Sequence, residues 1–367
     1  MENLDLIDLF IKLLSQESIT PNDGGLIDFA GEYLSDFEQI RIDKEGVKNI
    51  FLTKKFGDGE HLCFAGHVDV VPPGEGWNTP PFTPTIIDGN IYARGAQDMK
   101  SGVAAFLKAV KETKEFNGRL SILLTSDEEG DAFYGTKIVL QELEKRDLLP
   151  DYAVVAEPTC EELFGDAIKI GRRGSVNGVL KLHGKQGHAA YPAKSVNVIN
   201  LIAPILPKIA GKNLDNGDEF FEPSQFVITD IRAGLEVTNV TPGLLKMMFN
   251  VRNSTKTSPE DIEKFVRSSF EGLEYELDMK PSSKPFMTNP DSKIVNLIAN
   301  SIKSVTDIDT KLSTAGGTSD ARFFGEYGVD TVEFGVINDT IHAPNERTSI
   351  KEVQDLYRVF KLLIKEF

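Results

Sequence analysis

The segment Leu62-Cys63-Phe64-Ala65-Gly66-His67-Val68-Asp69 joins a short apolar run to a polar turn, and this combination defines the architecture of the chain. Its first four residues form an unbroken apolar run, which is typical of a strand buried on both faces in a parallel sheet. Three further runs of this kind follow, at Leu120–Leu124, Tyr152–Ala156 and Thr331–Ile337. Helical patterns occur at Met99–Phe116, Gly135–Lys145, Ser292–Ser304 and Lys351–Lys365. Strands that alternate with helices predict an α/β domain with a mainly parallel central sheet.

The middle of the chain has a different periodicity. Leu245, Met247, Phe249 and Val251 alternate with more polar residues, as in a half-exposed strand. Two helices are expected in this region, at Val196–Ile209 and Pro259–Phe270. The order β-α-β-β-α-β from about residue 175 to residue 280 is that of a ferredoxin-like sandwich. We therefore predict one α/β domain, residues 1–174 and 286–367, interrupted by a small α+β domain at residues 175–285.

The composition excludes several classes of protein. A net charge of -16 argues against binding to nucleic acid or to anionic membrane surfaces. The sequence contains no run of about 18 apolar residues, the length needed to span a bilayer, so we expect no membrane span. The first residues are acidic and have the apolar spacing of an amphipathic helix, unlike a signal peptide. The two cysteines, Cys63 and Cys160, stand far apart in no paired motif, so we expect a soluble protein of the reducing cytoplasm.

Acidic and imidazole side chains follow the ends of the predicted strands. His67 follows the first strand, Glu129 the second, Glu157 the third, and His342 comes a few residues after the last. Asp98 precedes the long helix. Because open α/β sheets bind ligands beyond the carboxyl ends of their strands, we expect these five residues to converge. Like charges in a shared site resist ionisation, so the convergence predicts bound cations.

This set of ligands is typical of two metal ions. Imidazole together with carboxylate suits zinc, with cobalt or manganese as substitutes. Five ligands exceed the needs of one open catalytic site but fit two ions that share a carboxylate. Two dications, the three carboxylates of Asp98, Glu129 and Glu157, and a bridging hydroxide sum to zero charge. Such a pair, about 3.5–4 Å apart, activates water and polarises a carbonyl.

Two further acids are expected to support the centre. Asp69 lies two residues after His67 in an extended segment, so its carboxylate is expected to hold the other nitrogen of the His67 ring. Glu128 is adjacent to a ligand but points elsewhere, and we expect it to act as the general base.

Several sequence blocks resemble a known family. HVDVVPPG, WNTPPFTP, ARGAQDMKSG, TSDEEGDAFYGT and EPT resemble the zinc aminoacylase and carboxypeptidase superfamily. GRRGSVNG, QGHAAYP, TNVTP and TAGGTSDARF narrow the resemblance to its bacterial succinyl-diaminopimelate desuccinylase branch. The resemblance implies a zinc-exopeptidase-like catalytic domain and a dimerisation or lid domain. It also implies hydrolysis of N-succinyl-LL-2,6-diaminopimelate to succinate and LL-2,6-diaminopimelate, in lysine and cell-wall precursor biosynthesis.

The resemblance also assigns roles to residues of the metal centre. One Zn²⁺ is implied on His67 and Glu157 and a second on Glu129 and His342, with Asp98 bridging both and Co²⁺ as a substitute. Asp69 supports a ligand, and Glu128 is the base. The peptide bond after Asp98 is implied to be cis. Gln97 departs from relatives, which often have a small residue there, and is expected to adjust packing and not chemistry.

Further residues are implied outside the metal centre. His188 is implied to donate to the oxyanion in the partner subunit's site, which requires a homodimer through the small domain. The residues implied to bind substrate are Arg172, Ser175, Tyr191, Asn239, Arg252, Gly317, Thr318 and Asn345. Arginine suits carboxylates by its planar fork, and the turn at 316–319 suits an anion by its amides, whereas the role of Arg173 stays open.

Two other functions compete with this interpretation. Acetylornithine deacetylase, or a related aminoacylase or exopeptidase, would use the same metal ligands but not the full GRRGS and GGTSDAR blocks. A zinc-binding scaffold without activity would need a damaged set of ligands or a missing base, whereas this sequence retains the five ligands and the base. The remaining histidines, His61 and His183, fit no motif and are expected to be structural or exposed.

Overall fold

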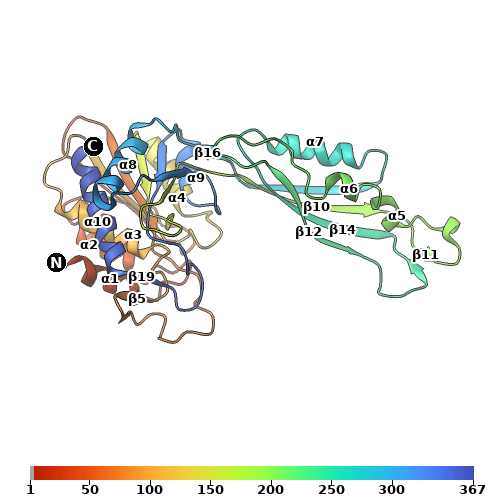
Figure 1. Ribbon diagram of the computed structural model, residues 1–367, viewed down its shortest axis with the longest axis horizontal. Helices are drawn as coiled ribbons and strands as arrows, with labels where there is room; N and C mark the ends of the chain where they lie inside the picture. The colour runs from red at the N-terminus through yellow and green to blue at the C-terminus, as the bar shows by residue number, and fades with distance from the viewer. Residues whose placement is uncertain (1–3) are drawn as a thin grey trace. The chain divides into compact units, whose positions relative to one another are not determined.

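The computed structural model describes residues 4–367, which form two compact units. Unit 1 comprises the chain up to Gly171, Thr288–Ser313 and Ser319–Phe367, and unit 2 comprises Arg172–Met287 and Thr314–Thr318. The chain thus enters unit 2 a few residues before the predicted boundary at Ser175. The short segment 314–318 belongs to unit 2, which the sequence did not indicate. Figure 1 shows the elements of both units.

The central sheet of unit 1 has the order β1-β2-β6-β3-β7-β18-β8-β17. The four predicted strands are β3 (His61–His67), β6 (Arg119–Thr125), β7 (Tyr152–Val155) and β18 (Asp330–Glu333). They run parallel to their neighbours in this group, and every residue of β3 is buried. The sheet is completed by β1 (Glu38–Arg41), β2 (Asn49–Lys55), β8 (Ala167–Lys169) and β17 (Lys311–Ser313). The mainly parallel sheet is therefore confirmed.

The helices of unit 1 occupy the predicted ranges. They are α3 (Lys100–Glu112), α4 (Thr136–Lys145), α8 (Lys293–Thr306) and α10 (Ile350–Glu366). The amphipathic first helix is α1 (Leu6–Leu14), capped by the Asp5 carboxylate, which accepts from the amides of Ile7 and Asp8. Helices α1, α3, α8 and α10 pack together, and α4 packs with α9 (Ala321–Glu326). Within residues 4–367 no helix has the length and apolar character needed to cross a membrane.

Smaller elements complete unit 1. A three-stranded sheet contains β4 (Thr85–Ile87), β5 (Asn90–Tyr92) and β19 (Arg347–Ser349). Helix α2 (Leu26–Tyr33) contacts β2. The short strands β9 (Gly171–Arg172) and β16 (Phe286–Met287) pair where the chain passes from one unit to the other.

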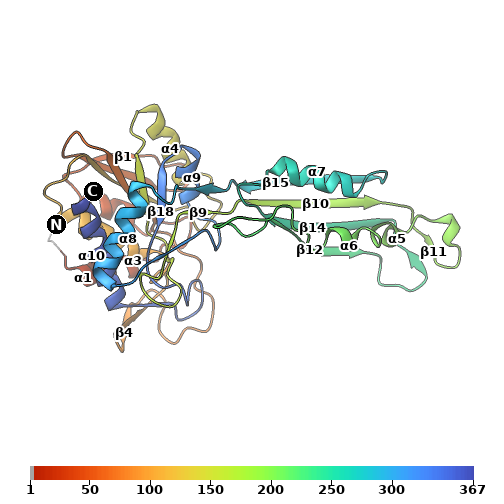
Figure 2. The ribbon, with the colours of Figure 1, turned by 45° about the horizontal axis from the view of Figure 1, so that its top comes forward.

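Unit 2 is a four-stranded antiparallel sheet with helices packed on it. Its order is β12 (Gln225–Ala233), β14 (Leu244–Arg252), β10 (Ser175–His183) and β15 (Tyr275–Ser283). Helix α7 (Pro259–Ser269) begins at a capping box between Ser258 and Asp261. The short elements are β11 (Gly187–His188), the 3-10 helix Pro192–Lys194 and β13 (Val240–Thr241). The order of long elements confirms the predicted ferredoxin-like arrangement, which Figure 2 shows from a second direction.

One predicted element of unit 2 is wrong. Val196–Ile209 was expected to be a single helix, but the chain forms α5 (Val198–Ile202) and α6 (Leu206–Ile209). Pro204 lies in the break and Pro207 lies in the first turn of α6. Proline has no amide hydrogen and its ring clashes with the preceding turn, so it ends a helix that apolar periodicity alone would continue.

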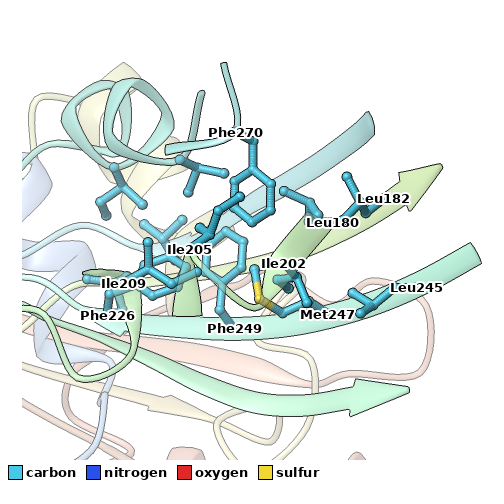
Figure 3. Close-up of a cluster of buried hydrophobic side chains, with 14 of the residues drawn as sticks. Leu180, Leu182, Ile202, Ile205, Ile209, Phe226, Leu245, Met247, Phe249 and Phe270 are labelled. Carbon is cyan, nitrogen blue, oxygen red and sulfur yellow. The ribbon is translucent and has the colours of Figure 1, made fainter. Parts of the chain in front are cut away.

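The core of unit 2 lies between the sheet and its helices. Figure 3 shows side chains from β10, β12 and β14 facing those from α5, α6 and the end of α7. Gly178 on β10 lies opposite Phe249 on β14. A Cβ atom at residue 178 would lie 2.0 Å from Phe249 Cζ. The absence of a side chain at this position therefore makes room for the Phe249 ring.

We predict that Gly178→Ala destabilises unit 2, because the added methyl group would overlap the Phe249 ring. Overpacking of this kind typically costs about 1–3 kcal/mol. The measurement is the free energy of unfolding from denaturant titration. The control is Lys181→Ala, an exposed position on the same strand, which should change stability by less than about 0.5 kcal/mol. Equal stability of Gly178→Ala and the wild type would contradict the packing described here.

Candidate metal centre

The site lies where the parallel strands of unit 1 end. His67 is the last residue of β3, Glu128 and Glu129 follow β6, and Glu157 follows β7. Because these strands are parallel neighbours, their carboxyl ends share one edge of the sheet. The convergence predicted from the sequence is therefore a consequence of strand direction.

Asp98 lies between two histidines. Its Oδ1 is 3.0 Å from Nε2 of His67, and its Oδ2 is 3.1 Å from Nε2 of His342. His342 Nε2 is also 2.9 Å from Oε1 of Glu129. Each oxygen of one carboxylate thus faces a different imidazole, which is the arrangement a ligand shared by two ions would need.

Glu157 completes one side of the centre. Its Oε1 is 3.9 Å from Nε2 of His67 and is buried without a hydrogen-bond partner. Glu128 Oε2 lies at the same distance, 3.9 Å, from that nitrogen. A buried carboxylate oxygen with no partner is costly, and a bound cation would remove the cost.

The residues present fit a pair of metal ions. Three overlapping groups have ligand atoms within 4.8 Å of one another: His67, Asp98 and Glu157; Asp98, Glu129 and His342; and His67, Glu128 and Glu129. The first two groups share only Asp98. Nitrogen and oxygen ligands each about 2.0–2.2 Å from a zinc ion lie roughly 3 Å apart, as several of these atoms do.

Burial and the charges of neighbouring side chains change the pKa values of the acids and histidines of this site. Burial, followed by the charges of neighbouring groups, raises the pKa of Glu157 and of Glu128 well above the usual range. Burial alone would lower the pKa of His67, but its hydrogen bond to Asp98 and the nearby acids raise it well above normal. The hydrogen bonds to Asp98 and Glu129 raise the pKa of His342 to about 10. This excess of negative charge attracts protons and would equally attract metal ions.

The Asp69 carboxylate makes contacts that the sequence did not indicate. The His67 ring contacts the main-chain oxygen of Asp69, 2.9 Å from Nδ1, whereas the Asp69 carboxylate is 3.6 Å from that nitrogen. The carboxylate instead accepts from the amide of Glu129 at 3.2 Å and lies 3.5 Å from the amide of Glu128. The carboxylate is therefore too far from the ring for a direct hydrogen bond, and it holds the turn that carries Glu128 and Glu129.

Sequence reasoning missed a buried ion pair beside the centre. Arg94 Nη1 lies 2.6 Å from Oε2 of Glu346, and both side chains are almost completely buried. The Glu346 carboxylate accepts from the main-chain amides of Gly95, Gln97 and Asp98 at 3.0, 2.7 and 3.1 Å. It thereby fixes the segment that presents Asp98, after which the peptide bond is cis, as the resemblance implied. The sequence contains one signal for this ion pair: the basic Arg94 shortly precedes the candidate ligand Asp98, and the acidic Glu346 shortly follows the candidate ligand His342.

The glycine turn at 314–318 holds a predicted substrate residue. Arg172 Nη1 donates to the carbonyl oxygens of Ala315 and Gly317, at 3.2 and 3.3 Å. Gly316 has a φ of 105°, and a Cβ there would lie 2.5 Å from the guanidinium. The turn was expected to present amides to an anion, and the structure shows that its carbonyl groups bind Arg172.

Arg173 and Arg252 lie together on unit 2. With Asn213, Glu222 and Gln225 they line a cavity of about 330 Å³. Arg173 forms an exposed ion pair with Glu222 at 3.2 Å. Burial and the neighbouring charge of Arg173 lower the pKa of Arg252. Two neighbouring guanidinium groups favour an anion between them.

His188 and two implied substrate residues lie at the other end of unit 2. Strand β11 pairs His188 with Val240 on β13, and the amide of Ala189 donates to the carbonyl of Asn239. The rings of His188 and Tyr191 are 5.7 Å apart, edge to face. Nδ1 of His188 accepts from the amide of Ala190 at 3.1 Å. In a neutral imidazole this places the proton on Nε2.

The remaining residues of interest have structural contacts. The side chain of Asn345 accepts from the amide of Asn78 at 2.7 Å, and buried Ser175 accepts from Asn250 at 3.1 Å. Thr318 is partly exposed. His61 is buried and hydrogen-bonds Ser121 at 2.6 Å. His183 is partly exposed near Glu276.

A comparison with known protein families identifies the family of this chain. Residues 63–366 match peptidase family M20/M25/M40. The chain belongs to this family. Succinyl-diaminopimelate desuccinylase of Nitratiruptor sp. is 67% identical over 99% of this chain and 100% of its own length. The enzyme of the same name from Sulfurovum sp. is 65% identical over 99% of each chain.

Solved structures share the fold over the whole chain. Aminopeptidase PepT from Bacillus cereus has a TM-score of 0.83 at 19% identity, covering 100% of this chain and 99% of its own. Bacillus subtilis YxeP, described as a dinuclear metal-binding peptidase of the M20 family, has a TM-score of 0.72 at 14% identity, covering 99% and 97%. These similarities confirm the predicted zinc-exopeptidase-like fold.

We predict that zinc raises the thermal unfolding midpoint of chelator-treated protein, because cations relieve the repulsion among the buried acids. At a free concentration of 100 Kd, binding stabilises the fold by about 2.7 kcal/mol. Mg²⁺ at equal concentration should act weakly, because it prefers oxygen ligands. Asp98→Asn should lose most of the zinc effect, while the exposed Asp36→Asn should retain it. An unchanged shift in Asp98→Asn would argue against a metal centre here.

Proposed function

We propose that this chain hydrolyses the amide bond of N-succinyl-LL-2,6-diaminopimelate to succinate and LL-2,6-diaminopimelate, using two metal ions. The observation that carries the proposal is the placement of Asp98, whose two oxygens face different histidines at 3.0 and 3.1 Å. The substrate is supported by relatives named succinyl-diaminopimelate desuccinylase, of which six are 55–67% identical over nearly their full lengths.

The ligands divide into two sets with a shared member. His67 and Glu157 would hold one ion, Glu129 and His342 would hold the other, and Asp98 would contribute to both sets. Mixed imidazole and carboxylate ligation suits Zn²⁺, and Co²⁺ accepts the same ligands. When bound, such a pair of ions would supply an activated water and polarise the amide carbonyl.

Glu128 moves the proton. Its Oε2 lies 3.9 Å from the His67 nitrogen and so faces the same space as the ligands without belonging to either of the first two sets. A carboxylate in this position, beside the ligands but outside both sets, can accept a proton from a water held by the ions. It takes the proton of the attacking water and returns it to the leaving amine. Asp69 holds the main chain at Glu128 and Glu129 and so keeps the base beside its neighbouring ligand.

His188 stabilises the developing oxyanion. The amide of Ala190 occupies its Nδ1, so Nε2 is the donor. A hydrogen-bond donor that acts only when negative charge develops stabilises the transition state. It does not strengthen the binding of the substrate.

The dimensions of unit 2 favour donation between subunits. Arg172 and Arg252 lie at the end of the sheet where β10 begins, and His188 follows the end where β10 finishes. Figure 2 shows β11 beyond one end of β10. The nine residues of β10 span roughly 26 Å at about 3.3 Å per residue, more than a small substrate can bridge. If His188 and the arginines act on one substrate, they belong to different subunits.

A homodimer through unit 2 would supply that partner. Strand β12 is an edge strand, and Val227 and Ile231 on it are exposed, which suits pairing with a second copy. Tyr191, near His188, is 59% exposed and would reach the substrate together with it. Asn239 holds the main chain beside His188.

Arginines of unit 2 recognise the carboxylates of the substrate. The groups that recognise the carboxylates and the amide of the substrate come from Arg172, Ser175, Arg252 and the turn at Gly317 and Thr318. Asn345 orients the substrate beside His342. The two cysteines are buried free thiols, which suits the reducing cytoplasm as the compartment of this reaction.

We predict that succinate release from N-succinyl-LL-2,6-diaminopimelate exceeds acetate release from N-acetylornithine by at least about 100-fold in kcat/KM. The reason is that a site built for a second carboxylate leaves buried polar groups unpaired when that carboxylate is missing. The measurement is initial rate with two equivalents of zinc. Preference for N-acetylornithine would favour the deacetylase alternative, and hydrolysis of neither compound would favour the scaffold.

A mixing experiment tests the roles of Glu128 and His188. We predict that Glu128→Gln and His188→Ala each lose about 10²–10³-fold or more in kcat with metal content unchanged. Mixed in equal amounts and allowed to exchange subunits, they should recover about one quarter of wild-type activity, because half of the random dimers contain one intact site. No recovery despite confirmed exchange would place both residues in one subunit's site.

A further inference from the structure

The loop that presents Asp98 and the loop that presents His342 are joined by hydrogen bonds from buried residues with no proposed role in the chemistry. Arg94 Nη2 donates to the carbonyl of His342 at 3.2 Å, and Nη1 donates to the carbonyl of Ala343 at 3.3 Å. Its ion pair with Glu346 links these contacts to the amide of Asp98. Arg94 is 1% exposed and Glu346 is fully buried.

Gln97 forms a second connection between the same loops. Its Nε2 donates to Oδ1 of Asp339 at 2.6 Å, and its Oε1 accepts from the amide of Thr340 at 2.9 Å. Gln97 is 2% exposed, so its amide has few alternatives to these partners. We call these contacts of Arg94 and Gln97 the interloop hydrogen bonds. The sequence suggested that Gln97 adjusts packing only, whereas its side chain connects the two ligand loops.

The loop of His342 depends on such contacts because no regular element holds it. It lies between β18 and β19, and the His342 side chain is 47% exposed. His342 has a φ of 58° and Asn345 a φ of 61°, left-handed conformations that are unfavourable for residues with side chains. Interactions outside the loop must therefore maintain this backbone.

The two proposed metal sites differ in how the fold positions their ligands. His67 ends the fully buried strand β3, and Glu157 follows β7, so the central sheet positions both. In the other site Glu129 follows β6, but His342 lies in the middle of the loop between β18 and β19. Loss of an interloop hydrogen bond would therefore affect the ligand set of His342 more than that of His67.

We propose that Gln97 is a positioning residue that fixes His342 against Asp98 and thereby sets the metal affinity of the His342 site. This inference rests on the proposed two-metal centre but not on the identity of the substrate. Gln97 does not contact the reacting atoms. Its two hydrogen bonds determine where residues 339–342 lie, and residues that orient metal ligands typically change affinity by about 10–100-fold when lost.

The test is calorimetric titration of chelator-treated full-length protein with Zn²⁺, with a competing chelator for the tighter site. We expect Gln97→Ala to weaken one of the two equivalents by about 10–100-fold and to leave the other within about threefold. The control is Gln39→Ala, which removes a glutamine that donates to the carbonyl of Gly31 at 2.8 Å, away from the metal centre. It should bind both equivalents as the wild type does.

Variants of Asp339 separate the hydrogen bond from the neighbouring ion pair. Asp339 also pairs with Arg347 at 2.8 Å. Asp339→Asn removes that charge but keeps an oxygen that can accept from Gln97, so it should preserve metal affinity. Asp339→Ala should weaken the same equivalent as Gln97→Ala, and the double variant should be no weaker than Gln97→Ala alone.

The outcomes distinguish this inference from the proposed function. Unchanged affinity of both equivalents in Gln97→Ala, or equal weakening of both, overturns the positioning role, whatever the substrate. Wild-type protein that takes up one equivalent only overturns it as well. Selective weakening in a protein that hydrolyses no succinylated compound would support the positioning role and reject the substrate.

Discussion

The main constraint on unit 1 is electrostatic, because several carboxylates and two imidazoles lie together at one edge of a buried parallel sheet. Parallel strands bring their carboxyl ends together, so the acids that follow β6 and β7 approach His67 at the end of β3. Repulsion and burial raise the pKa of Glu128 and Glu157. The surrounding loops are arranged so that this unfavourable concentration of charge persists and attracts cations.

Much of this arrangement could be predicted from the sequence, because the signals are local. The apolar runs specify buried strands, and the polar residues that follow each run specify the edge at which they meet. His67, Asp98, Glu129, Glu157 and His342 were therefore found without knowledge of the fold. The alternation of Leu245, Met247 and Phe249 likewise identified a half-buried strand of unit 2.

The features that escaped prediction depend on long-range contacts or on competition between local signals. Arg94 and Glu346 are 252 residues apart, and nothing in the sequence indicates that they meet. The bonding of Asp69 to a neighbouring turn, and not to the ring beside it, depends on loop geometry. In unit 2, apolar spacing suggested one long helix, but Pro204 and Pro207 outweighed it.

Asp69 connects the end of β3 to the turn that carries Glu128 and Glu129, and this has an evolutionary consequence. One fully buried carboxylate contacts the main chain at both Glu128 and Glu129, so the proposed proton acceptor and its neighbouring proposed ligand share one attachment. A mutation that shifts one of them shifts the other. Divergence toward new substrates within this family is therefore expected to change unit 2 and the loops around the centre, while this turn is inherited nearly intact.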